Sequence, residues 1–138
     1  MMTILVIDGQ GGNIGKQLVK LIRERLPDAR ILAVGTNSIA TSSMIKAGAD
    51  NAATGENSVV VCSRSADIIT GPVGIVIADS LMGEVTAAMA AAVGSSPAQK
   101  VLVPFNKCGT VIAGVGEKTA SALIEDAVRH IERVASGE

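Results

Sequence analysis

A glycine-rich turn follows the first apolar run of the sequence and leads into a stretch with helical spacing. The turn comprises Asp8, Gly9, Gln10, Gly11, Gly12, Asn13, Ile14 and Gly15. Glycine lets a backbone approach a ligand closely, and the N-terminus of a helix attracts negative charge. We therefore predict that residues 9–15 bind a nucleotide or another phosphorylated small molecule. The alternative is a tight turn between a strand and a helix that binds nothing.

The turn differs from two known phosphate-binding motifs. A strict G-x-G-x-x-G pattern needs glycine at position 14, where Ile14 stands, and the third glycine comes one residue later at Gly15. A Walker A loop needs glycine at position 10 and a hydroxyl group at position 17, but Gln10 and Gln17 stand there. The hydroxyl that would hold Mg²⁺ is therefore missing. We interpret Lys16 as a solvated helix residue.

Polar residues also follow later predicted strands. Thr36 and Asn37 follow the second strand, and Asn106 follows the last long one. Ligands of open parallel sheets bind at the carboxyl ends of the strands, so we expect these three residues to bind the same ligand as the turn. The second strand lacks the terminal carboxylate that contacts the ribose of NAD. This argues against NAD specifically and leaves a mononucleotide or another phosphorylated metabolite open.

Three residues are candidates for catalysis. Lys107 supplies a cation that can lower the pKa of Cys108, although Cys108 is equally well explained as an inert apolar residue. Asp8 is an acid–base candidate, but we favour a role in closing its own turn. An NAD(P)-dependent oxidoreductase, or another enzyme using Lys107 and Cys108, is therefore an alternative function. The single histidine, His130, is expected on the surface, and no Cys/His spacing indicates a metal site.

The elements that position these residues alternate along the chain. Apolar runs predict strands over 3–8, 30–35, 51–54, 67–70, 100–105 and 111–115. Helical spacing and capping residues predict helices over 14–26, 39–47, 57–66, 84–93 and 119–134, while 74–82 suits either type. Glu84 is expected to complement the N-terminus of the helix that follows it. The alternation predicts one Rossmann-like three-layer α/β/α domain over residues 1–138, with a mostly parallel sheet of about five to six strands.

Composition excludes several classes of protein. The 12 basic and 13 acidic residues nearly cancel, and Phe105 is the single aromatic residue, so we expect no nucleic-acid binding. Met1 runs directly into a strand-like segment without a basic leader, and no apolar stretch is long enough to span a membrane. We therefore expect a cytoplasmic protein, with Cys62 and Cys108 reduced.

Several segments carry a family resemblance. The stretches DGQGGNIGKQ, VGTNSIATSSMIKAGAD, ATGEN, ADIITGPVGIVIADSLMGE and VPFNKCG resemble a small bacterial family known only as a domain of unknown function. The resemblance covers nearly the whole chain and implies a Rossmann-like domain, but it brings no assigned reaction. The glycine-rich turn alone is similar to that of the gamma domain of 2-ketoacid ferredoxin oxidoreductases.

The mean hydropathy of +0.43 predicts that apolar surface remains exposed in a single copy of the chain. We therefore expect a homo-oligomer; a structural subunit that binds a different partner protein is the alternative. Light scattering at micromolar concentration should show a mass above that of one chain. A monomer under these conditions would contradict the expectation.

Overall fold

The computed structural model describes residues 1–105 and 109–138. Five strands form one sheet in the order β3-β2-β1-β4-β5, and every neighbouring pair is parallel. The strands are β1 (Thr3–Asp8), β2 (Arg30–Gly35), β3 (Asn51–Thr54), β4 (Ile68–Pro72) and β5 (Gln99–Val103). This topology is Rossmann-like, as the alternating pattern of the sequence predicts.

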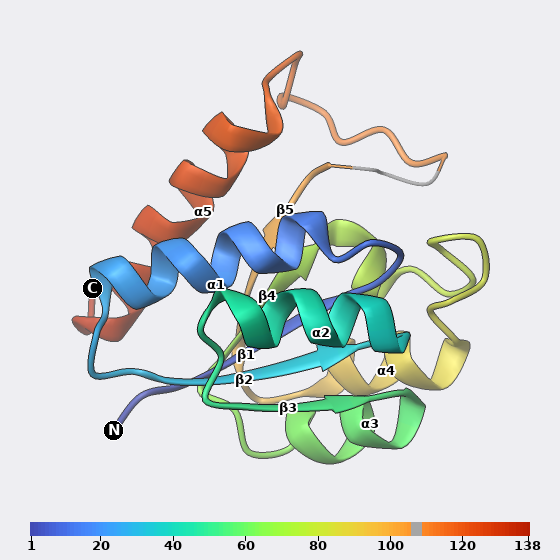
Figure 1. The fold of residues 1–138 in the computed structure, drawn as a ribbon. Coiled ribbons are helices and arrows are strands. Elements are labelled where there is room, and N and C mark those ends of the chain that lie inside the picture. The colour runs from blue at the N-terminus through green and yellow to red at the C-terminus, as the bar shows by residue number, and fades with distance from the viewer. Residues whose placement is uncertain (106–108) are drawn as a thin grey trace.

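Helices cover both faces of the sheet (Figure 1). They are α1 (Asn13–Arg25), α2 (Ser38–Ala47), α3 (Glu56–Ser63), α4 (Ala87–Ser95) and α5 (Ala120–Ala135), with a short 3-10 helix, η1 (Val73–Val76). The first two helices and α5 lie on one face, and α3 and α4 lie on the other. The three-layer arrangement is thus confirmed. No helix in the described part of the chain is long and apolar enough to cross a bilayer.

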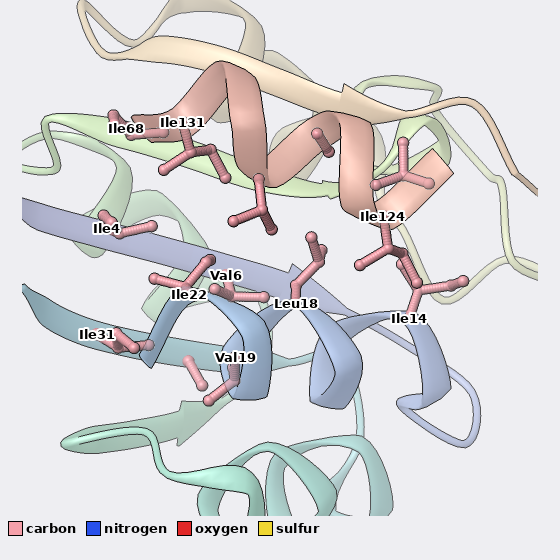
Figure 2. Close-up of a cluster of buried hydrophobic side chains, with 14 of the residues drawn as sticks. Ile4, Val6, Ile14, Leu18, Val19, Ile22, Ile31, Ile68, Ile124 and Ile131 are labelled. Carbon is pink, nitrogen blue, oxygen red and sulfur yellow. The ribbon is translucent and has the colours of Figure 1, made fainter. Parts of the chain in front are cut away.

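The central strand β1 is apolar because both of its faces are buried. Ile4 and Val6 point into the core beneath α1 and α5, which Figure 2 shows in close-up. Leu5 and Ile7 alternate with them and point into the core beneath α3 and α4. Such a continuous apolar run is typical of a strand inside a parallel sheet. Because β1 is the central strand, the glycine-rich turn that follows it lies at the middle of the carboxyl edge of the sheet.

The largest differences from the predicted elements lie after β4. That strand runs to Pro72 rather than ending at residue 70, because Gly71 and Pro72 stay in register with β5. Residues 74–76 belong to the 3-10 helix η1, and residues 77–82 form turns and a bend rather than a strand or an α-helix. The next helix begins at residue 87 rather than 84, since the side chain of Thr86 caps it by accepting a hydrogen bond from the Met89 amide at 3.1 Å. Residues 111–115 form no strand, and Val111 is exposed.

Gly71 is required by a close approach between β4 and β1. A Cβ atom at this position would lie 2.1 Å from the carbonyl oxygen of Ile7. We expect Gly71→Ala to lower the free energy of unfolding by about 3 kcal/mol, because a strand must shift to make room.

The matched control is Gly94→Ala in α4, where a Cβ meets nothing within 4 Å. This change should be neutral or stabilising by about 0.5 kcal/mol, because alanine favours a helix. Urea denaturation followed by circular dichroism measures both effects, and equal stabilities of the two variants would contradict the close approach.

Candidate functional site

A small pocket lies at the carboxyl edge of the sheet, where the strand order reverses between β1 and β4. Its volume is about 80 Å³, and it is lined by residues 8–14 together with Pro72, Leu81 and Phe105. Pockets that enclose whole small molecules usually measure roughly 300–1,000 Å³. The pocket therefore has room for a group of about the size of a phosphate, and the rest of a larger ligand would have to lie outside it.

The carboxylate of Asp8 is folded into the glycine-rich turn. Its Oδ1 accepts a hydrogen bond from the amide of Gly9 at 2.8 Å, and its Oδ2 accepts one from the amide of Gly15 at 2.6 Å. The residue is 5% exposed, and this burial raises the pKa of the carboxyl group to about 6, although the two hydrogen bonds oppose the rise. Asp8 thus joins the end of β1 to the first turn of α1, as the turn-closing interpretation of the sequence expects.

Three of the four glycines in the turn serve its packing. A Cβ atom added at Gly9, Gly12 or Gly15 would lie within 2.8 Å of a neighbouring heavy atom. Gly12 also has a φ of 74°, which favours glycine. A Cβ at Gly11, in contrast, meets nothing within 4 Å. Gly11 therefore offers its backbone to the solvent, while the other three allow the turn to lie against its neighbours.

Two backbone amides of the turn remain available to a ligand. Among the described residues, none accepts a hydrogen bond from the amide of Gly11 or Asn13, and both residues are exposed. The amide of Gly12 donates to the carbonyl of Gly9 at 2.9 Å, and that of Gly15 is taken by Asp8. The two available donors lie at the N-terminus of α1, where the helix dipole favours an anion.

A second carboxylate lies on the other side of the turn. The Oε1 atom of Glu84 accepts hydrogen bonds from the Gln10 amide at 2.8 Å, the Thr36 hydroxyl at 2.6 Å and the Asn37 side-chain amide at 2.8 Å. Burial raises the pKa of Glu84, but the hydrogen bonds from Thr36, Gln10 and Asn37 outweigh it and hold the pKa below its usual range. Glu84 is therefore ionised at neutral pH.

This contact changes the interpretation of three residues. Thr36 and Asn37, which the sequence predicts to bind a ligand, donate to Glu84 in this structure, and their binding of a ligand stays a prediction. Glu84 itself does not complement the helix that follows it, because Thr86 caps that helix. The end of β2 has no carboxylate of its own, but the carboxylate of Glu84 lies there. Glu84 is 47 positions further along the chain than Asn37. No local sequence signal connects the two, so only the fold reveals the pair.

The remaining candidates are dispersed or lie outside the described residues. Asn106, Lys107 and Cys108 belong to the latter group, so their proposed roles stay predictions. His130 is exposed on α5, 3.6 Å from Asp126, which agrees with a surface position. Among the residues that the structure describes, no cluster of three His, Cys, Asp or Glu side chains could hold a metal ion.

The sequence matches a family model over residues 3–136, and its description is "Domain of unknown function (DUF3842)". The chain therefore belongs to this family. No curated protein matches it. The family resemblance seen in the sequence is thus confirmed.

Two solved structures are similar to the chain. The crystal structure of AibC matches with a TM-score of 0.50 and 19% identity, over 97% of this chain and 42% of AibC. A dodecameric FMN-dependent Ubix-like decarboxylase from Escherichia coli O157:H7 matches with a TM-score of 0.44 and 15% identity, over 96% of this chain and 94% of that one. The chain spans less than half the length of AibC. At 19% identity, the AibC match shows a shared fold alone.

The raised pKa of Asp8 predicts a pH dependence of stability. Below about pH 4 the carboxyl group is protonated in both the folded and the unfolded chain. Between about pH 4 and pH 6 the unfolded chain loses this proton first, so the stabilisation that the group provides falls as the pH rises. The shift from 3.8 to about 6 corresponds to a loss on the order of 3 kcal/mol.

Asp8→Asn removes this titration and serves as the reference. The unfolding free energy of the native chain minus that of the variant should fall between about pH 4 and pH 7 and then stay constant. Urea denaturation at a series of pH values measures the difference. A difference that is flat or rises over this range would show that the pKa of Asp8 is not raised.

Proposed function

We propose that this member of the DUF3842 family binds a nucleotide or another phosphorylated small molecule through its glycine-rich turn, with the phosphate in the pocket at the edge of the sheet. The pocket supports this most directly, because it lies where the strand order reverses between β1 and β4. Ligands of open α/β sheets bind at this position. The exposed amides of Gly11 and Asn13 supply hydrogen bonds that phosphate oxygens accept.

The surroundings of the pocket favour a phosphate on balance. Pro72, Leu81 and Phe105 form an apolar wall that limits the water in contact with a bound group. The dipole of α1 favours the anion, while the ionised Asp8 behind the turn opposes it. Asp8 accepts hydrogen bonds from the amides of Gly9 and Gly15, so it leaves the amides of Gly11 and Asn13 to a ligand. We expect binding that depends on hydrogen bonds more than on net charge.

The contact made by Glu84 bears on the kind of nucleotide. Thr36 and Asn37 are the residues that would hold the ribose of a dinucleotide at the end of β2, and Glu84 occupies both. A mononucleotide, or a smaller phosphorylated metabolite, needs only the pocket and the space outside it. We therefore favour such a ligand over NAD(P).

A thermal-shift screen with inorganic phosphate and mononucleotides tests the proposal. A ligand present at about 100 times its Kd should add about 2.7 kcal/mol of stability. For a domain of this size, this raises Tm by on the order of 8 °C. The chain has no Trp or Tyr, so melting should be followed by circular dichroism or a dye.

Gly11→Asp locates the site, because its Cβ has space and its carboxylate would repel a bound phosphate. We expect affinity to fall at least tenfold, because two like charges about 4 Å apart repel each other by about 1 kcal/mol in water and about 4 kcal/mol near a protein surface. Gly94→Asp makes the same substitution in open space on α4 and should bind like the native chain. Equal losses in both variants, or no shift with any phosphorylated compound, would refute the proposal.

A further inference from the structure

The contact made by Glu84 has the form of an occupied anion site. One carboxylate oxygen receives three hydrogen bonds of 2.6–2.8 Å, from the amide of Gln10, the hydroxyl of Thr36 and the side-chain amide of Asn37. The donors come from the turn after β1 and from the end of β2, two positions that the sheet holds in register. Asn37 is fixed further, because its side-chain oxygen accepts from the Ala40 amide at 2.9 Å and so caps α2.

The segment that delivers Glu84 is strained. In residues 79–84, which we call the strap, Asp79, Leu81 and Met82 have φ values of 65°, 53° and 56°. Residues other than glycine rarely adopt the left-handed region, because their Cβ atom comes too close to the following carbonyl oxygen. Backbone strain of this kind accumulates where the surrounding structure enforces it, often at functional sites. The side chain of Glu84 is the part of the strap that reaches the donors after β1 and β2.

The three donors and the phosphate pocket adjoin each other across Gly9. This residue lines the pocket, and a Cβ atom added to it would lie 3.0 Å from Oε1 of Glu84. The backbone of Gly9 therefore lies between the phosphate pocket and the three donors. Two linked phosphate groups can bridge such a separation, whereas a single phosphate reaches only one side.

We propose that Gln10, Thr36 and Asn37 form a second anion subsite, that Glu84 is its internal occupant, and that a pyrophosphate group, such as that of a nucleoside diphosphate, displaces Glu84 on binding. The inference rests on the proposed function, because the first phosphate takes the pocket beside Gly11. The second phosphate then takes the three donors. It can accept them on separate oxygens, whereas Glu84 places all three on one.

Calorimetric titration with inorganic pyrophosphate and with inorganic phosphate tests the inference. Glu84→Ala removes the internal occupant. Glu84→Gln keeps the size of the side chain but removes its charge, and it replaces the alanine variant if that variant fails to fold. We expect either variant to bind pyrophosphate at least tenfold more tightly than the native chain. The affinity for inorganic phosphate in the pocket should change much less.

Glu56→Gln is the matched control. Glu56 accepts a hydrogen bond at 2.5 Å from the hydroxyl of Thr86, two residues after the strap, and it lies outside the three-donor subsite. The substitution removes the same charge, so it should leave pyrophosphate affinity unchanged. An equal gain in this variant would assign the effect to net charge and overturn the inference. Unchanged or weaker pyrophosphate binding in the Glu84 variants would also overturn the inference. Weaker binding would mean that Glu84 contacts the ligand.

The two proposals fail separately. If inorganic phosphate binds no form of the protein but the Glu84 variants gain pyrophosphate binding, the second subsite stands and the pocket does not. If phosphate binds all forms equally and pyrophosphate shows no gain, the pocket stands alone.

Hydrogen exchange of the native chain gives an independent check. Backbone amides of residues 77–86 should exchange faster when pyrophosphate is saturating, because the strap is released. Unchanged or slower exchange in this segment would overturn the displacement of Glu84.

Discussion

The buried carboxylate of Asp8 is the interaction on which the carboxyl edge of this protein depends. It binds the amides at both ends of the turn, Gly9 and Gly15, and so fixes where β1 stops and how α1 begins. Its backbone carbonyl also accepts a hydrogen bond from the Thr36 amide at 3.0 Å, which ties the turn to the end of β2. Asp8 thus holds together the turn that carries the exposed amides and the strand end that carries Thr36.

The same interaction gives the site an unusual electrostatic balance. In an open phosphate-binding turn, the helix N-terminus would face the ligand alone. Here the carboxylate of Asp8 accepts hydrogen bonds from the amides of Gly9 and Gly15 inside the turn. A second carboxylate, that of Glu84, accepts one from the Gln10 amide on its outer side. The protein therefore holds two internal anions where Rossmann-like folds commonly receive external ones. Asp8 is buried and belongs to the folded core, whereas Glu84 is half-buried at the end of a strained segment.

The fold could be predicted from sequence to a large extent. The first two strands, β1 and β2, have the predicted bounds. Helix α2 begins one residue earlier than predicted, and α5 is shifted by one residue at both ends. These elements have strong local signals: continuous apolar runs for the strands, helical spacing for α5, and Gly48 at the end of α2. The sequence predicts the segment after β4 poorly. Its apolar residues 74–82 have no clear period, and contacts with α4 and the glycine-rich turn shape it.

The sequence by itself determined the alternating α/β architecture and the place of the glycine-rich turn, because both depend on residues close together in the chain. Only the tertiary structure decided what the turn contacts. The pairing of Glu84 with Gln10, Thr36 and Asn37 spans 47 to 74 residues, and the pocket joins the turn to Pro72, Leu81 and Phe105. Such contacts exist because parallel strands bring their carboxyl ends to one edge, and no local pattern specifies which side chains meet there.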